Sequence, residues 1–422
     1  MLQTKTPVYL LERHNKDALL SAFSGKPLNA LRTPALVVDR KLFAQNCANM
    51  HRKAKEWGAQ FRAHLKTHKT AEGATLQLVS DEDRTHAVIV STLMEAWEVV
   101  RAGLVANATV KDILYGLPVA PNKIEDLSAL RRELDKYGGI VRLLVDHPDQ
   151  VKFLEEFEAK QGAPTRCRAG LSPASKEFIF LVRAILKSPA TSLHGFYGHA
   201  GNAYGSTSLP EASLYLSGEV ESVNAAAKNA LEIISQLDVE PSVTNPFVLS
   251  VGSTPTAHAA SAETRNALSQ VLNGVLELHA GNYPMLDLQQ QHTALIDHAR
   301  ISQRVRATVI SYYSGRGVGG TDEAMIDAGG IAFSKDTGPS EVFGEVIGRP
   351  WVLSRISQEH GILTRSTLTS ANEEPLKLGT IVDVIGQHAC MIAAAYPWYY
   401  VVDPDVDDGK TVVDIWVPWK GW

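Results

Sequence analysis

The sequence predicts an α/β fold, with a (β/α)8-type barrel followed by a domain made mainly of β-strands. In the first two-thirds, short apolar β-branched runs alternate with longer amphipathic runs, as β/α units do. After about Asp287, strand-like runs follow one another without long helices between them. The chain of 422 residues is 45% hydrophobic, which suffices for two globular domains. We therefore assign residues 40–286 to the barrel, and residues 287–422 together with 1–39 to the β domain.

The number of apolar runs favours a barrel over an open sheet. The expected barrel strands are Phe61–Lys66, Ala87–Val90, Ile113–Leu117, Ile140–Val145, Leu193–Gly198, Phe247–Val251 and Val275–His279. An eighth strand should lie within residues 160–173, but KQGAPTRCRAGLSP contains no strand-like run. The barrel is therefore expected to have one truncated strand, which would leave unpaired backbone groups at its edge.

Elsewhere, one helix stands out by its buried stripe, which consists of Phe43, Cys47, Met50, Ala54 and Trp57 at helical spacing. The β domain is expected to contain the strands Val305–Tyr312, Phe343–Ile347, Trp351–Ile356, Lys377–Ile385, Tyr399–Val402 and Thr411–Val417.

Composition argues against several classes of partner. The formal net charge is -5 and no basic patch stands out, so we expect no nucleic-acid partner. The N-terminus has no apolar signal segment, and the longest apolar stretch, 391–402, is interrupted by Pro397, so we expect no membrane segment. The three cysteines are few and scattered, which indicates a reducing, cytoplasmic compartment.

The strand FRAHLK, residues 61–66, carries the first candidate chemistry. Its alternation places Arg62, His64 and Lys66 on one face. Three basic side chains on a strand otherwise suited to burial indicate a wet, anionic site. Lys66 comes at the carboxyl end, where barrel enzymes place their reactive groups, and a lysine amine can act as a nucleophile. Alternatively, residues 66–69 are only the solvated end of a strand.

Two turns rich in small residues could bind a phosphate group. One follows Val251 and the other follows His279; they contribute Gly252, Ser253 and Thr254, and Gly281, Asn282 and Tyr283. Glycine lets backbone amides approach an anion, and neighbouring loops at the end of a barrel often hold a phosphate. Each loop is also compatible with an ordinary turn. His199 and Tyr204 could face the ring of a ligand, or could be satisfied core residues.

His388 and Cys390 follow a predicted strand and are separated by one residue. In an extended segment this spacing puts both side chains on one face. Imidazole and thiolate suit zinc, and two protein ligands leave positions for water or substrate, as in a catalytic metal site. A chance match to so short a pattern remains the alternative.

Together these motifs resemble the fold-type III pyridoxal phosphate enzymes, the alanine-racemase-like class, and in particular the zinc-dependent D-serine dehydratases of fungi and other eukaryotes. The similar segments run in order along nearly the whole chain: TPALVVD (33–39), RAHLKTHKTAEG (62–73), VSTLMEA (90–96), GFYGHAGNAY (195–204), LSVGSTPT (249–256), LELHAGNYPMLDLQQ (276–290), SQEHGIL (357–363), PLKLGTIVDVIGQHAC (375–390) and DIWVPWKGW (414–422).

The resemblance implies that Lys66, and not Lys69, carries pyridoxal phosphate. It implies that Tyr204 is a neighbour of the cofactor and that His388 and Cys390 hold zinc. It also implies that the phosphate lies at the two small-residue turns, at Gly252, Ser253, Thr254, Gly281, Asn282 and Tyr283. Two copies of the chain are expected to pair as a homodimer.

The resemblance further implies dehydration of D-serine to pyruvate and ammonia. Related D-threonine aldolases have aspartate in place of the cysteine of the H-x-C pair, so Cys390 favours a dehydratase. Four alternatives remain open. They are a D-threonine aldolase, a D-threo-3-hydroxyaspartate dehydratase, a non-enzymatic carrier of pyridoxal phosphate, and an inactive remnant caused by the truncated strand.

Overall fold

The structure, a computed structural model, describes residues 4–8, 10, 12–161, 165–169, 171–237, 242–268, 271–365 and 376–422. It contains two compact units. The first consists of Met1–Glu12, Ala48–Gly281 and Trp419–Trp422, and the second of Arg13–Cys47 and Asn282–Pro418. The division after Gly281 lies near the predicted residue 286, but residues 1–12 and 419–422 belong to the barrel unit and residues 40–47 to the second unit, which differs from the predicted division.

The first unit contains a closed barrel of parallel strands, as the sequence predicted. Its strands pair in chain order from β2 to β9, and β9 pairs with β2 to complete the ring. They are β2 Gln60–His64, β3 Ala87–Val90, β4 Asp112–Pro118, β5 Ile140–Val145, β6 Thr165–Ala169, β7 Thr191–Tyr197, β8 Val243–Val251 and β9 Gly274–Ala280. In a closed barrel of this kind the carboxyl ends of all strands meet at one rim.

The expectation that residues 160–173 lack a strand was wrong. Strand β6, Thr165–Ala169, pairs in parallel with both β5 and β7, so the barrel has no open edge there. Backbone pairing with two neighbouring strands holds this short segment, although it lacks the run of apolar residues by which the other barrel strands were predicted. Residues 162–164 and 170 of the predicted gap lie outside the described residues.

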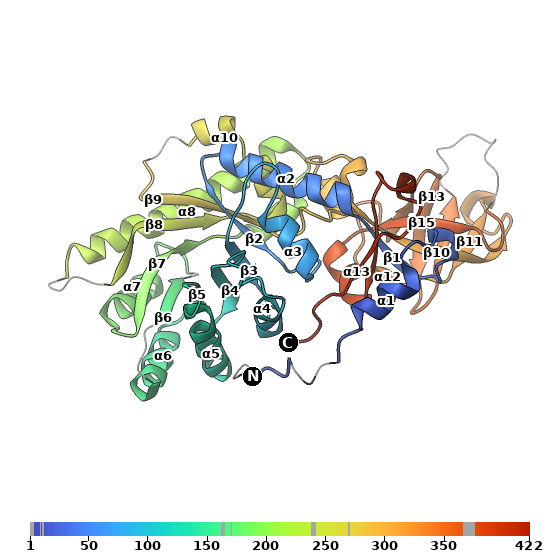
Figure 1. Ribbon diagram of the computed structural model, residues 1–422. Helices are drawn as coiled ribbons and strands as arrows, with labels where there is room; N and C mark the ends of the chain where they lie inside the picture. Colours follow the sequence, from blue (N-terminus) through green and yellow to red (C-terminus); the bar gives the residue numbers. More distant parts are fainter. Residues whose placement is uncertain are drawn as a thin grey trace. The chain divides into compact units, whose positions relative to one another are not determined.

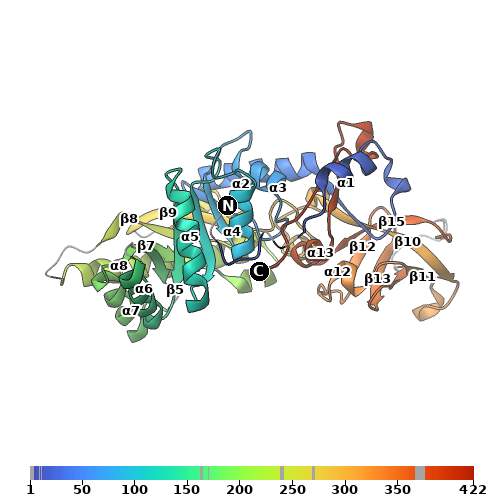
Figure 2. The ribbon, with the colours of Figure 1, turned by 60° about the horizontal axis from the view of Figure 1, so that its bottom comes forward.

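Helices follow the barrel strands and cover their outer side (Figures 1 and 2). They are α3 Ala71–Leu78, α4 Leu93–Arg101, α5 Ile124–Asp135, α6 Pro148–Gln161, α7 Lys176–Lys187, α8 Leu209–Ile234, α9 Thr254–Ala259 and α10 Ala262–Asn266. Hydroxyl side chains cap several of them: Thr70, Thr92 and Ser208 accept backbone N–H groups at the starts of α3, α4 and α8. Helix α2, Arg40–Glu56, contains most of the predicted stripe, and all five stripe residues are at most 2% exposed.

The second unit is built on a mixed sheet with the strand order β11-β14-β13-β12-β15-β10-β1-β16-β17. The strands are β1 Ala35–Asp39, β10 Gln303–Tyr313, β11 Glu323–Ile326, β12 Gly344–Val346, β13 Trp351–Ile356, β14 Gly361–Arg365, β15 Ile381–Gly386, β16 Tyr399–Val402 and β17 Asp414–Trp416. The pairs are antiparallel except for β1 with β16. Strands β11 and β14 were not predicted, because their runs are short and lie between polar segments.

Short helices accompany this sheet: α1 Lys16–Phe23, α11 Leu288–His292, α12 Gly330–Phe333 and α13 Ala389–Ala395. Helices α12 and α13 lie side by side (Figures 1 and 2). One part of the core contains Leu28, Leu31, Val37, Tyr400 and Ile415, and Leu19, Leu20 and Phe23 of α1 pack against it. Across the described ranges, no helix combines the length and apolar character needed to cross a bilayer.

Candidate active site

A cavity of about 280 Å³ opens at the carboxyl-terminal rim of the barrel. We call it the lysine pocket. It is lined by His64, Lys66, Ser91, Gly116, Leu117, Tyr197, His199, Tyr204, Gly252, Ser253, Thr254, His279, Ala280 and Gly281. These residues come from the ends of six strands or the loops that follow them. The structure thus brings together the predicted lysine, the predicted His199 and Tyr204, and parts of both predicted phosphate turns.

Lys66 lies in the turn directly after β2, and not within the strand as expected, because β2 ends at His64. The turn is held by Leu65, whose N–H donates to the carbonyl of Ile89 at 3.1 Å. Gly281 makes room for the lysine: a Cβ on Gly281 would lie 2.9 Å from Lys66 Cε. The lysine side chain therefore passes closely over the end of β9, and a side chain at position 281 would push it aside.

His64 lies beside Lys66 and is held in a fixed orientation. Its Nε2 is 2.9 Å from Ser91 Oγ, and Ser91 N donates to Glu95 Oε2 at 2.9 Å. Burial lowers the pKa of His64 well below its usual value, and the charge of Lys66 lowers it further. His64 is therefore neutral at physiological pH. Glu95 Oε1 also lies 3.0 Å from Lys69 Nζ, which ties the lysine turn to the start of α4.

The segment Gly252–Thr254, here called the glycine turn, has a backbone that requires glycine. Gly252 has φ +140°, and a Cβ there would lie 2.1 Å from the carbonyl oxygen of His279. Ser253 caps α9 in a reciprocal capping box with Thr256. The carbonyl of Gly252 accepts from His199 Nδ1 at 2.7 Å. Burial lowers the pKa of His199, so this ring is also neutral.

The wall of the pocket contains His279, which the sequence analysis had not assigned to a site. Its ring stacks on Tyr197 with centroids 4.3 Å apart and an interplanar angle of 11°. Ser250 Oγ donates to Glu277 Oε1 at 2.7 Å and lies 3.2 Å from His279 Nδ1. Because the single hydroxyl proton of Ser250 goes to the carboxylate, Ser250 accepts from His279, which fixes the proton on Nδ1.

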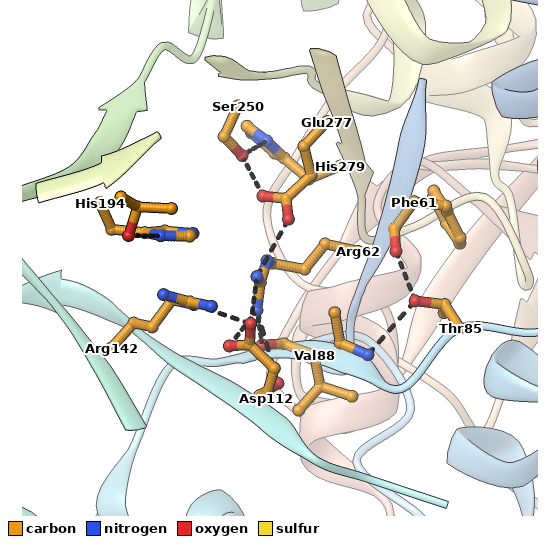
Figure 3. Close-up of polar contacts among 12 residues, drawn as sticks. Phe61, Arg62, Thr85, Val88, Asp112, Arg142, His194, Ser250, Glu277 and His279 are labelled. Carbon is orange, nitrogen blue, oxygen red and sulfur yellow. Dashed lines mark hydrogen bonds and ion pairs between the residues drawn. The ribbon is translucent and has the colours of Figure 1, made fainter. Parts of the chain in front are cut away.

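Behind Glu277, buried charges fill the barrel interior (Figure 3). Arg62 Nη2 lies 2.9 Å from Glu277 Oε2, and Arg62 also bonds both carboxylate oxygens of Asp112. Arg142 Nε donates to Asp112 at 2.7 Å. Arg62 had been expected to face an anionic site together with Lys66, and its anions are instead these two carboxylates. The sequence signal that could have predicted this buried network was the presence of polar residues two positions apart on one strand, such as Arg62 and His64.

A second, larger cavity of about 670 Å³ lies at the amino-terminal ends of the barrel strands. Arg62, Asp112, Arg142 and Glu277 line it. Their charges already pair with one another, and the cavity lies at the end of the barrel opposite the catalytic rim of such folds. We therefore assign the candidate chemistry to the smaller lysine pocket.

Asn282 and Tyr283 do not line the lysine pocket. Both belong to the second unit and are buried there. Asn282 Nδ2 donates to Asp287 Oδ2 at 2.5 Å. Of the second predicted phosphate turn, Gly281 lines the pocket, and Asn282 and Tyr283 do not.

His388 and Cys390 do not share an extended segment. Helix α13 begins at Ala389, so His388 is its N-cap and Cys390 lies in the first turn. The two side chains nevertheless interact. Burial lowers the pKa of His388, but the hydrogen bond and charge of Cys390 and the charges of Asp287 and Asp336 outweigh this effect and raise the pKa to about 9. The extended geometry expected for this pair was wrong, because a helix begins between the two residues, and their role as metal ligands stays a prediction.

Two carboxylates of the second unit form hydrogen bonds with His388 and with the peptide that follows it. Asp336 Oδ2 lies 3.1 Å from His388 Nδ1, and Asp287 Oδ2 accepts from Ala389 N at 2.7 Å. A carboxylate on one ring nitrogen leaves the other to bind a metal, an arrangement typical of histidine ligands. Among the described residues no group of three or more His, Cys, Asp and Glu side chains forms a metal cage. Imidazole and thiolate, the side-chain groups of His388 and Cys390, are donor types that suit zinc.

The comparisons with known proteins agree with this organisation. The family described as "Putative serine dehydratase domain" matches residues 302–402. A D-serine dehydratase of Schizosaccharomyces pombe is 39% identical, over 97% of this chain and 96% of its own length. One from Saccharomyces cerevisiae is 33% identical, over 96% of this chain and 99% of its own length.

A solved structure shares the fold. D-threo-3-hydroxyaspartate dehydratase from Delftia sp. HT23 superimposes with a TM-score of 0.76 at 28% identity, covering 94% of this chain and 100% of that one. A cysteine-to-alanine variant of that enzyme, described as the metal-free form, matches equally well. The lengths agree almost completely and the identity to the yeast enzymes exceeds 30%, so this chain is a lyase that belongs to the D-serine dehydratase family.

Proposed function

We propose that this chain dehydrates D-serine to pyruvate and ammonia, using pyridoxal phosphate bound by Lys66 and zinc bound by His388 and Cys390. The observation that carries the proposal is the lysine pocket. A lysine, a glycine turn with two hydroxyl residues and two neutral histidines meet there in a chain that is 39% identical to a D-serine dehydratase. The closed barrel argues against an inactive remnant with a missing strand.

The residues of the pocket fit pyridoxal phosphate by their chemistry. Lys66 supplies the amine, and the glycine turn brings the hydroxyl residues Ser253 and Thr254 to the pocket, where hydroxyl groups can donate to a phosphate. The cofactor supplies an electron sink for the negative charge that develops at the substrate Cα. The Lys66 Nζ is the group in the pocket that can take the α-proton, and neutral His64 beside it adds no positive charge.

The metal proposal rests on the donor chemistry of His388 and Cys390. Asp336 holds the His388 ring through Nδ1, and Asp287 holds the peptide between the two ligands. Zinc would act as a Lewis acid on the hydroxyl group that leaves the substrate. The metal-free form of the related dehydratase is a cysteine-to-alanine variant, which supports a cysteine ligand in that enzyme. Cys390 is the candidate equivalent here.

The cofactor is tested by spectroscopy on the purified protein. We expect a visible absorbance band that changes when D-serine is added and is lost in Lys66→Ala. Lys69→Ala is the matched control and should keep the band, because Lys69 pairs with Glu95 and does not line the pocket. Reduction with borohydride and peptide mass spectrometry should locate the adduct on Lys66. An adduct elsewhere, or none, would refute the assignment.

The metal and the substrate are tested separately. Thorough chelation should abolish pyruvate formation from D-serine, and added zinc should restore it. Activity that survives chelation excludes the catalytic role of zinc. A second candidate activity, the dehydration of D-threo-3-hydroxyaspartate, is favoured by the full-length match to the Delftia enzyme. Competition between the two substrates distinguishes them, and formation of glycine with an aldehyde would indicate an aldolase.

The homodimer and the cytoplasmic location stay predictions. Light scattering of the purified chain measures the first, and fractionation of cells measures the second.

A further inference from the structure

One buried carboxyl group near the lysine pocket has no role so far. Glu219 lies on α8 and is 6% exposed. Its Oε1 accepts from Ala200 N at 2.5 Å. Its Oε2 is buried and has no hydrogen-bond partner of good geometry among the described residues. A buried carboxylate with one well-formed hydrogen bond and weaker ones from Thr256 and Gly252 is unfavourable as an anion, so such a group in a native fold calls for an explanation.

Glu219 connects two segments that line the pocket. The first segment is represented by Ala200, which directly follows His199 and donates to Glu219. The second consists of Gly252 in the glycine turn and Thr256 in the helix after it, which also interact with Glu219. His199 Nδ1 and the carbonyl of Gly252 also bond to each other. The carboxyl group therefore lies behind the glycine turn, where a negative charge would repel an anion bound on the pocket side.

The protonation of Glu219 is balanced near neutral pH. Burial raises its pKa to about 7, although the Ala200 N–H, the Thr256 hydroxyl and the Gly252 N–H each lower it. The titratable groups on the elements packed against α8 are His194 and Tyr197 of β7, His199 and Tyr204 from the segment after it, His258 of α9, and Lys176, Glu177, Arg183 and Lys187 of α7. Within the described part of the chain, none of them contributes a charge interaction that shifts this carboxyl.

We propose that Glu219 is a positioning residue for the glycine turn, and that its carboxylate takes up a proton when a phosphate group binds at Gly252, Ser253 and Thr254. The proposal rests on the phosphate-bearing cofactor of the proposed function. The reason is electrostatic: a phosphate dianion near the carboxyl favours its neutral form. Binding of the anion is therefore linked to uptake of one proton, and it weakens as the pH rises above neutrality.

Calorimetry on the full chain freed of cofactor tests this linkage. Pyridoxal phosphate is titrated at pH 7 in two buffers of different ionisation enthalpy, which counts the protons taken up. Because part of the Glu219 carboxyl is charged there before binding, wild type should take up a fraction of a proton more than Glu219→Gln. From pH 7 to 8, the affinity of wild type relative to Glu219→Gln should fall, by at most about tenfold. Glu221→Gln, an exposed position on the same helix, should behave as wild type.

Pyridoxal, which lacks the phosphate, provides the second control and should give equal proton uptake in wild type and Glu219→Gln. If Glu219→Gln does not fold, the carboxyl carbon signal of Glu219 is followed by NMR in wild type, and it should move to the protonated position when phosphate is added. Equal uptake with pyridoxal phosphate, or a carboxyl signal that does not respond, would overturn the proposal.

Inorganic phosphate separates this proposal from the proposed function. Should pyridoxal phosphate fail to bind while inorganic phosphate binds with the extra proton, the cofactor assignment falls and the role of Glu219 stands. Failure of both anions to bind would refute the role of Glu219 as well.

Discussion

Arg62 and Glu277 form an ion pair inside the barrel, with Nη2 of the arginine 2.9 Å from Oε2 of the glutamate. Their side chains are 1% and 3% exposed. Arg62 also bonds Asp112, so one guanidinium neutralises two buried carboxylates (Figure 3). Glu277 in turn accepts from Ser250, which accepts from His279 in the pocket wall. The charged interior of the barrel thus reaches the candidate active site through hydrogen bonds.

Arg62→Met should therefore destabilise the protein strongly. Removing the guanidinium leaves two carboxylates buried without their main counter-charge, and breaking such a pair typically costs about 3–5 kcal/mol. Urea unfolding at pH 7 measures the change. Arg52→Met is the matched control, because Arg52 pairs with Glu82 at the surface, and its loss should be within about 1 kcal/mol. Similar losses in the two variants would contradict the assigned role of the network.

The same network predicts how stability changes in acid. Burial raises the pKa of Asp112, but the charges and hydrogen bonds of Arg62 and Arg142 outweigh it and lower the pKa to about 2. A carboxyl with a depressed pKa stabilises the fold above its unfolded value, near 3.8, and loses this contribution as the pH falls towards 2. The contribution is roughly 2 kcal/mol. Asp112→Asn should therefore be much less stable than wild type at pH 5, and the difference in stability should become smaller by pH 2. A stability difference that does not change with pH would contradict this prediction.

The barrel and its lysine could be predicted from the sequence because their signals are local. Alternating apolar runs give the strands, and Lys66 follows one of them directly. The glycine turn was predicted because glycine and hydroxyl residues stand together after a buried strand. Strand β6 could not be predicted, since it forms by pairing with two neighbours that are distant from it in sequence, and its own residues carry no strand pattern.

Glu219 escaped prediction for a related reason. Helix α8 contains many polar residues, and its sequence does not distinguish Glu219 from the others. The burial of Glu219 depends on contacts with Ala200 and Gly252, which are distant in sequence. The geometry of His388 and Cys390 was predicted as extended because their segment follows a strand. The helix α13 instead begins between them, and a two-residue spacing contains no information about that change.

The glycine turn gives a test of backbone strain. In Gly252→Ala, φ of +140° is unfavourable and the new Cβ would lie 2.1 Å from a backbone oxygen, so the turn must change. We expect a loss of stability and weaker binding of pyridoxal phosphate. Gly218→Ala is the control, since a Cβ there meets nothing within 4 Å on helix α8, and it should stabilise the fold by about 0.5–1 kcal/mol. Unchanged cofactor affinity in Gly252→Ala would argue that the phosphate binds elsewhere.

Asp336 offers a test of the metal site that does not remove a ligand. Its carboxylate lies 3.1 Å from His388 Nδ1 and holds the ring with Nε2 available for a metal. Asp336→Asn keeps the shape but weakens this support, and loss of such a partner typically lowers metal affinity about 10–100-fold. Competition with a fluorescent zinc chelator measures the affinity. Asp322→Asn is the control, because Asp322 bonds Tyr312 and Ser314 away from His388. Equal zinc affinity in all three proteins would mean that His388 does not bind the metal through Nε2 with Asp336 as its partner.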